Sequence, residues 1–350
     1  MKPILFSTPP KRILIIKPSA IGDVVHALPV LHLLRKRWPD AHISWLITPA
    51  CASLIEGHPE LDRVILFDRK RFGHAWRSWA ATKAFGEFCR QLKSESYDLV
   101  IDLQGLFRSG WLGWRSGAKL RVGLSNAREL ATFFYSHVIK VSWTQHAVDR
   151  NLAIAEALGC GRLPVEFNFG TREIDRVKIA ELVGSTLPYA VLIPGTNWAT
   201  KRWPVKHFVE TAKKIHEELG YEIVVAGSLD EAELGAQIPG LNLCGKTNLR
   251  ELVALLEKSN LVIANDSGPM HIAAALGKPL VSLFGPTNSA RTGPYSRPES
   301  VISLNLPCSP CYSRTCSHQS CLQWLEPDAV IKKGVELTLK GNARAMETDQ

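Results

Sequence analysis

Short apolar runs alternate with longer amphipathic segments along the chain. In the first half the apolar runs are RILIIK, HISWLI, RVILF, YDLVIDL and LRVGL, and helical patterns follow them at about 22–38, 49–57, 75–93 and 105–116. Nearly continuous apolar runs are typical of parallel strands that are covered on both faces. Pro29 lies inside the first helical pattern, which continues to Trp38, so we expect a kink there rather than an end.

The same alternation returns after residue 188, with the runs YAVLIP, YEIVVAG, LNLCG, LVIAND and LVSLFG. Between 160 and 188, Gly, Pro and polar residues surround one short helical segment. The pattern predicts an α/β protein with two Rossmann-like domains. We place them at 1–165 and 188–340, with a linker region at 166–187 and a disordered tail at 341–350.

Composition adds a compartment and a class of partner. The 350 residues are 45% hydrophobic, which suits two domains, and no apolar run is long enough to span a bilayer, so we expect a cytosolic protein. Residues 1–163 hold 23 Lys/Arg against 13 Asp/Glu, whereas 164–350 hold 19 against 20. The N-terminal half therefore predicts an anionic partner. No nucleic-acid-binding motif accompanies the charge, so we do not expect nucleic acid.

The stretch KPSAIGDVVHALP, residues 17–29, places the carboxylate of Asp23 where a strand passes into a helix. A phosphate-binding turn there needs glycines and bare N–H groups, and an acid would repel the phosphate. Asp23 therefore either caps its helix or serves a turn that handles something other than phosphate.

The sharpest stretch in the second half is NDSGPMHIAAALGKPLVSLFGPT, residues 265–287. Ser267 and Gly268 can offer N–H groups to a pyrophosphate at a helix start, and Asp266 can accept a hydrogen bond from a sugar hydroxyl. Ordinary N-capping is the alternative interpretation. We favour binding, because ligands of open α/β sheets lie at the carboxyl ends of the strands.

Two further strand ends in this half carry polar groups. PGTNWATKRWP, residues 194–204, presents Thr196 and Lys201, and a lysine there can neutralise a diphosphate leaving group. VVAGSLDEAEL, residues 224–234, places Glu231 in a first helical turn, which is a weak signal by itself. The three strand ends together predict one ligand site.

The two stretches 17–29 and 265–287, with TKRWP and PCSPCY, resemble glycosyltransferase family 9, the ADP-heptose:lipopolysaccharide heptosyltransferases. The resemblance covers about residues 12–330. It implies the GT-B fold, in which two Rossmann-like domains with parallel sheets face each other across a cleft. It also implies a nucleotide-sugar donor in the C-terminal domain and an anionic acceptor, the Kdo-bearing inner core of lipid A, in the N-terminal one.

By the same resemblance, Asp23 is the catalytic base, Lys201 faces the donor's diphosphate and Glu231 binds the adenosine ribose. The remaining donor-binding residues are expected to be Thr196, Asn197, Asp266, Ser267, Gly268 and His271. Asn197 departs from the paired small hydroxyl residues common in the family.

Acceptor candidates come from the basic N-terminal half. Segment 69–93 holds seven Lys/Arg and one acid, and we expect its first cations to lie in a loop before the helix at 75–93. The candidates are Ser19, Gly22, Arg69, Lys70, Arg71, Arg108 and Arg121. The basic surface also favours a peripheral position on the cytoplasmic face of the inner membrane.

The reaction we infer is inverting displacement of ADP without a metal or other cofactor, because the chain has no Asp-x-Asp pair to hold a diphosphate-bound cation. Four cysteines, Cys308, Cys311, Cys316 and Cys321, have a spacing that can hold zinc or an iron–sulfur cluster. We favour reduced thiols or an adventitious disulfide over structural zinc, and no role in catalysis.

The resemblance thus makes the chain a heptosyltransferase of the lipopolysaccharide inner core. Two alternatives stay open, a GT-B transferase that uses another nucleotide sugar and a non-catalytic relative that binds the sugar nucleotide or the lipid. Whether the first or the second heptose is added is also open.

Overall fold

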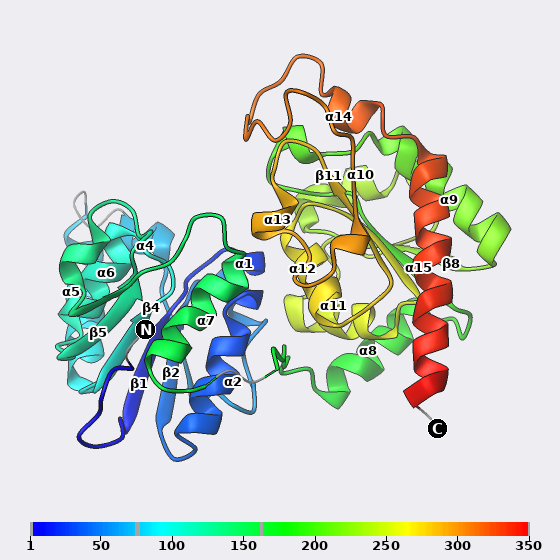
Figure 1. Ribbon diagram of the computed structural model, residues 1–350. Coiled ribbons are helices and arrows are strands. Elements are labelled where there is room, and N and C mark those ends of the chain that lie inside the picture. The colour runs from blue at the N-terminus through cyan, green and yellow to red at the C-terminus, as the bar shows by residue number, and fades with distance from the viewer. Residues whose placement is uncertain (1–2, 74–77, 162–163, 349–350) are drawn as a thin grey trace. The chain divides into compact units, whose positions relative to one another are not determined.

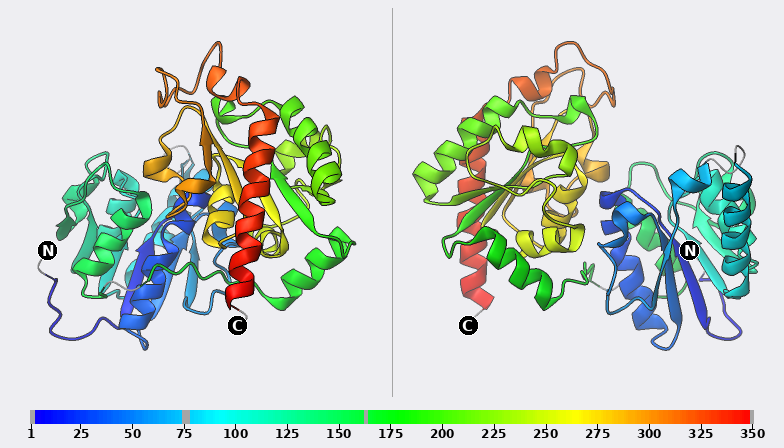
Figure 2. Two further views of the ribbon diagram at one scale, coloured as in Figure 1. Left: turned by 45° about the vertical axis from the view of Figure 1, so that its right-hand side comes forward. Right: turned by 180° about the vertical axis from the view of Figure 1, so that it is seen from behind.

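The computed structural model describes residues 3–73, 78–161 and 164–348, which form two α/β units (Figure 1). The first unit comprises residues 1–170 and the second 171–350. Each is a parallel sheet with helices on both faces, as the two views in Figure 2 show. The predicted pair of Rossmann-like α/β domains is confirmed.

The described residues of the first unit form a six-stranded sheet in the order β3-β2-β1-β4-β5-β6. Every neighbouring pair in this sheet is parallel. The strands are β1 (Arg12–Ile16), β2 (His42–Ile47), β3 (Arg63–Leu66), β4 (Leu99–Asp102), β5 (Leu120–Leu124) and β6 (His137–Ile139).

The second sheet, again among the described residues, has the order β12-β11-β10-β7-β8-β9. Its strands are β7 (Tyr189–Ile193), β8 (Glu222–Val225), β9 (Leu241–Asn242), β10 (Leu261–Asn265), β11 (Leu280–Phe284) and β12 (Val301–Ser303). In both sheets the chain starts in the middle, runs to one edge and returns to build the other half. Ligands of such sheets bind where the order reverses, which is beside β1 and β4 here and beside β7 and β10.

The helices of the first unit are α1 (Ile21–Val25), α2 (Leu28–Arg37), α3 (Pro49–Ala52), α4 (Arg69–Gly73), α5 (Trp79–Ser94), α6 (Phe107–Arg115) and α7 (Ala147–Ala157). Those of the second unit are α8 (Glu173–Val183), α9 (Val205–Leu219), α10 (Ala232–Gly235), α11 (Leu249–Lys258), α12 (Gly268–Ala275), α13 (Ser289–Thr292), α14 (Ser320–Gln323) and α15 (Pro327–Thr348). No described helix is long and apolar enough to cross a bilayer.

The central strands explain the continuous apolar runs. Residues 13–16 of β1 and 261–264 of β10 are fully buried, because helices cover both faces of each sheet. The edge strands β6 and β12 have only three residues each, and most of those side chains are accessible to water. Their patterns were too short and too exposed to be recognised in the sequence.

The expected kink at Pro29 is wrong. Helix α1 ends at Val25, and a new helix, α2, begins at Leu28 with Pro29 in its first turn. A proline is tolerated there because the first N–H groups of a helix have no intrahelical acceptor. The apolar spacing continued across the break because most residues of both short helices are buried.

Two expectations about the chain's connections also change. The predicted linker region, 166–187, is divided between the units, and α8 packs on α11 of the second unit through the buried Arg250–Asp175 ion pair of 2.8 Å. Residues 341–348 of the expected disordered tail continue α15, in keeping with the helix-forming residues of ARAME. The last two residues of that tail lie outside the described residues.

Candidate functional site

The end of β1 places Asp23 at the reversal of the first sheet. Its Oδ2 accepts a hydrogen bond of 3.3 Å from the Ala20 N–H and lies 3.8 Å from the buried Lys17 Nζ. Lys17 Nζ in turn donates to the Leu103 carbonyl at 3.0 Å, which links the ends of β1 and β4. The Asp23 side chain remains 50% exposed. The carboxylate therefore caps α1 and is also accessible to a ligand.

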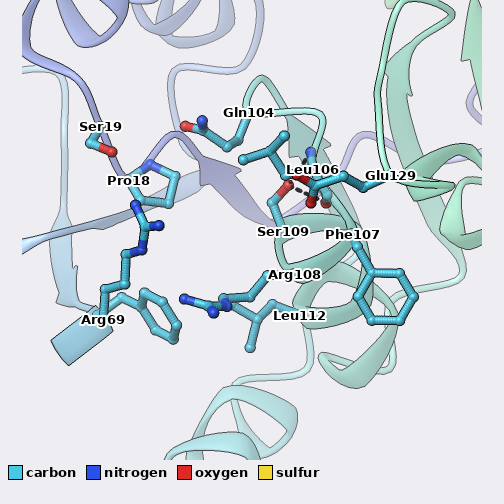
Figure 3. A pocket seen from close by; sticks show the side chains of 11 residues that line it. Pro18, Ser19, Arg69, Gln104, Leu106, Phe107, Arg108, Ser109, Leu112 and Glu129 are labelled. Atoms are coloured by element: carbon cyan, nitrogen blue, oxygen red, sulfur yellow. Dashed lines mark hydrogen bonds between the residues drawn. The ribbon is translucent and has the colours of Figure 1, made fainter. Parts of the chain in front are cut away.

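A pocket of about 310 Å³ opens beside these strand ends. Figure 3 shows Arg108, from α6, extending across it toward the side that holds Arg69, from α4, whose guanidinium lies near Pro18. The polar part of its lining consists of Ser19, Arg69, Gln104, Arg108, Ser109 and Glu129. Three predicted acceptor residues, Ser19, Arg69 and Arg108, thus line one cavity. The two arginines bring two guanidinium groups to it.

Two residues of the pocket lining, Gln104 and Ser109, are hydrogen-bonded to Asp102, which the sequence analysis missed. This carboxylate at the end of β4 accepts hydrogen bonds from Tyr135 Oη at 2.7 Å and Ser109 Oγ at 2.8 Å. It also accepts from the N–H groups of Gln104 at 2.9 Å and Gly105 at 3.1 Å. Burial raises the pKa of Asp102 despite these donors, and burial beside that carboxylate raises the pKa of Tyr135. An acid at the end of a buried apolar run was the available signal.

The other acceptor candidates take different places. Arg69, Lys70 and Arg71 lie in the short helix α4, not in a loop as expected, and Lys70 and Arg71 are exposed outside the pocket. Gly22 is buried within α1. Arg121 lies near the start of β5, at the amino-terminal ends of the strands and so opposite the pocket. It donates to the carbonyls of Ala118, Lys119 and Phe134. We therefore withdraw Arg121 as an acceptor residue.

In the second unit, an ion pair joins the ends of β7 and β10. Lys201 Nζ lies 2.6 Å from Asp266 Oδ2, and Thr287 Oγ1 donates to the same oxygen at 2.5 Å. The two charged side chains are only 17% and 7% exposed. Thr196 Oγ1 donates to the Asp266 carbonyl at 3.0 Å, so predicted donor residues from two strands form one network.

Buried hydrogen bonds from Asn265 fix the same two strand ends. Its Nδ2 donates to the Pro194 carbonyl at 2.7 Å, and its Oδ1 accepts from the Trp203 N–H at 3.1 Å. Trp203 is buried and packs edge-on against Phe208. The loop that carries Lys201 is therefore held at both ends by the β10 terminus. Asn197, in contrast, is exposed on this loop.

Glu231 lies over the ends of β7 and β8 because two glycines leave room for it. A Cβ at Gly195 would lie 1.9 Å from Glu231 Cδ, and one at Gly227 would lie 2.7 Å from Glu231 Oε2. The carboxylate accepts a 2.7 Å hydrogen bond from the Ser228 N–H. Its place beside the end of β7 brings it to the same side of the sheet as Lys201, at the carboxyl ends of the strands.

Helix α12 begins at this edge without a side-chain cap. Ser267 is its N-cap residue, yet the hydroxyl makes no capping bond, and Ser267 Oγ has no partner among the described residues. This disagrees with the simple N-capping interpretation of Ser267. Gly268 opens the helix, and His271 is buried one turn in. The N-terminal N–H groups and the helix dipole thus remain suited to an anion.

The four clustered cysteines carry free thiols. Burial raises the pKa of Cys321, and the nearby Cys311, Cys308 and Cys316 add to this shift. Within the described residues, no three His, Cys, Asp or Glu side chains are arranged to hold a metal ion. The loop bearing these thiols lies against the end of β11, since Ser309 Oγ donates to the Gly285 carbonyl.

The chain has two parallel sheets of this topology, and polar groups gather where the strand order of each sheet reverses. Together with the comparison with known proteins, this defines a glycosyltransferase of the GT-B class. The sequence profile of glycosyltransferase family 9 (heptosyltransferase) matches residues 85–322, so the chain belongs to this family, as predicted. It is a glycosyltransferase enzyme.

Individual relatives agree with this assignment over most of their length. The chain is 35% identical to lipopolysaccharide heptosyltransferase 1 of Pseudomonas aeruginosa over 321 residues, with 88% of each chain covered. It is 30% identical to the protein of the same name from Escherichia coli K12, covering 83% of this chain and 92% of that one. The structure of E. coli heptosyltransferase WaaC with ADP superposes with a TM-score of 0.76 at 27% identity, covering 93% and 99%.

Replacing Asp102 tests the hydrogen bonds that its carboxylate accepts beside the pocket. Asp102→Asn sets an amide N–H₂ against a hydroxyl donor, so we expect the free energy of unfolding to fall by about 1–3 kcal/mol. Tyr135→Phe, which removes one donor only, should lose less. Urea denaturation of both variants measures the free energy of unfolding. An unchanged value for Asp102→Asn would contradict the role of Asp102 as the acceptor of these hydrogen bonds.

The Lys201–Asp266 pair is tested by a double-mutant cycle. Lys201→Met leaves a buried carboxylate without its cation, so the free energy of unfolding should fall by about 3 kcal/mol. The double variant Lys201→Met, Asp266→Asn should recover most of that loss, because no uncompensated charge remains. A double variant no more stable than Lys201→Met in urea would rule the pair out as the cause.

The room for Glu231 is tested at Gly195. In Gly195→Ala the new Cβ must displace the carboxylate, and overpacking should lower the free energy of unfolding by about 1–3 kcal/mol. Gly86→Ala is the control, because nothing lies within 4 Å of its Cβ in α5 and it should be neutral or slightly stabilising. A crystal structure of Gly195→Ala with Glu231 unmoved would refute this account.

Proposed function

We propose that this enzyme transfers heptose from ADP-L-glycero-D-manno-heptose to the Kdo-bearing inner core of lipopolysaccharide, with inversion at the anomeric carbon. Support comes from the family and from relatives whose names specify lipopolysaccharide heptosyltransferase. A solved relative with ADP-2-deoxy-2-fluoro heptose, 27% identical to this chain, supports the donor class. The lead alternative is another nucleotide sugar.

The observation that carries the proposal is the chemistry of the two sheet reversals. In the first unit an accessible carboxylate, Asp23, lies at the end of β1, and a pocket with two arginines opens at the same sheet edge. In the second unit a cation, an uncapped helix start and Glu231 meet at another. The transfer needs a base and cations beside an anionic acceptor, and it needs cations beside a diphosphate donor.

On the acceptor side, Asp23 takes the proton of the attacking sugar hydroxyl as the new glycosidic bond forms. Lys17 and the Ala20 N–H hold the carboxylate in place, so little reorganisation is needed. Arg69 and Arg108 in the pocket suit the carboxylate or phosphate groups of the acceptor. A Kdo-lipid A acceptor fits this chemistry.

On the donor side, ADP leaves as negative charge builds on its phosphate oxygens. Lys201 and the N–H groups at the start of α12 stabilise that charge, while Asp266, Thr196 and His271 contact the sugar and phosphates. Glu231 accepts hydrogen bonds from the ribose hydroxyls. The reaction so written uses no metal ion and no other cofactor.

The enzyme's acceptor also bears on where it works. The excess of basic residues lies in residues 1–163, where the acceptor site is proposed. Basic surfaces are attracted to anionic lipid. We therefore propose that the protein acts in the cytoplasm, peripherally bound to the inner membrane.

Removing the proposed base tests the reaction. Asp23→Ala should reduce acceptor-dependent ADP release at least ~100-fold, because a positioned base contributes roughly 10²–10⁴-fold. Loss of its capping bond alone should cost only about 1 kcal/mol of stability. The assay uses ADP-heptose with Kdo-lipid A, with or without a first heptose, and a melting curve for each variant.

The matched control is Asp40→Ala, which removes an exposed acid of the same unit that lies before β2, away from the carboxyl ends of the strands. It should leave turnover unchanged. Normal turnover in Asp23→Ala would reduce Asp23 to a helix cap. Turnover of the parent only with a different nucleotide sugar would favour the alternative transferase, and binding without turnover would favour a non-catalytic relative.

A further inference from the structure

The loop between β12 and α14, residues 304–319, lies against the donor edge of the second sheet, by which we mean the carboxyl ends of its strands, where the donor is proposed to bind. It is the orange segment leading into α14 in Figure 1. Thr200 Oγ1 donates to the Ser313 carbonyl at 2.8 Å, and the Tyr312 N–H donates to the Pro286 carbonyl at 2.7 Å. The loop is thus fixed to the residue before Lys201 and to the end of β11.

This attachment brings a second cation beside Lys201. The Arg314 guanidinium carbon lies 4.7 Å from the centre of the Trp198 ring, and Lys201 Nζ lies 4.6 Å from the same centre. The two cations are therefore no further apart than the sum of these distances. Both are within the range of cation–π attraction, so the indole positions them together.

The charges of these two cations are not equally available. Lys201 is already paired with the buried Asp266 at 2.6 Å, so the pair has little net charge. Arg314 is exposed, and no acidic side chain in the described part of the chain pairs with it. A nucleotide diphosphate carries more than one negative charge and gains more as it leaves. The Lys201–Asp266 pair alone cannot balance that charge.

We propose that Arg314, presented by loop 304–319 and positioned by Trp198, binds the diphosphate of the donor and of the departing nucleotide. The planar guanidinium fork can give two parallel hydrogen bonds to phosphate oxygens, which a lysine cannot. This inference deepens the proposed function and rests on it. It also gives loop 304–319 a role in the donor site.

The test compares binding of ADP and of adenosine by titration calorimetry. Arg314→Gln should weaken ADP binding by about tenfold, as for a lost hydrogen bond to a charged group, and should leave adenosine binding unchanged. Arg314→Lys should recover part of the loss. Lys213→Gln, which removes an exposed cation of α9 in the same unit, is the charge-matched control and should bind ADP normally.

Several outcomes overturn the proposal. Equal ADP affinity in Arg314→Gln and the parent would do so, and so would an equal weakening toward adenosine, which signals a displaced loop. Heptose transfer at the full rate by Arg314→Gln would refute this inference and leave the proposed function intact. Binding of UDP or GDP in place of ADP, with the same dependence on Arg314, would refute the proposed donor and uphold Arg314.

Discussion

The structure depends on one topological constraint, the reversal of strand order in the middle of each parallel sheet. Because the chain leaves the first strand of each sheet in one direction and returns on the other side, adjacent strand ends carry loops that diverge. Two loops at each reversal can then hold polar side chains without either loop being buried. In the first sheet these are the loops after β1 and β4, and in the second those after β7 and β10.

Buried charges at the reversals are each held by groups from another strand. Lys201 of the β7 loop pairs with Asp266 after β10, and Lys17 after β1 donates to the carbonyl of Leu103 after β4. Burying a lone ion is costly, so each contact links the position of one loop to that of its neighbour. These contacts position the charged side chains before any ligand arrives, and preorganised charge is what stabilises a leaving group.

Glycine and tryptophan give the donor edge its particular shape. Gly195 and Gly227 leave the space that the Glu231 carboxylate fills, and Trp198 brings Lys201 and Arg314 to one ring. Neither effect follows from the charge of the residues involved. Each depends in part on a contact between segments distant in the chain, Gly195 with Glu231 and Trp198 with Arg314.

The sequence by itself determined the two α/β units, the central strands and the polar strand ends, because burial on both faces imposes continuous apolar runs and functional groups follow those runs. Only the tertiary structure decided the break before Pro29, the withdrawal of Arg121 and the roles of Asp102, Lys17 and Arg314. The roles of Asp102, Lys17 and Arg314 each depend on a partner distant in the chain, Tyr135, Leu103 and Trp198 respectively, whose approach no local pattern encodes. Asp102 illustrates the reason: four donors spread from Gln104 to Tyr135 are needed to hold one buried carboxylate.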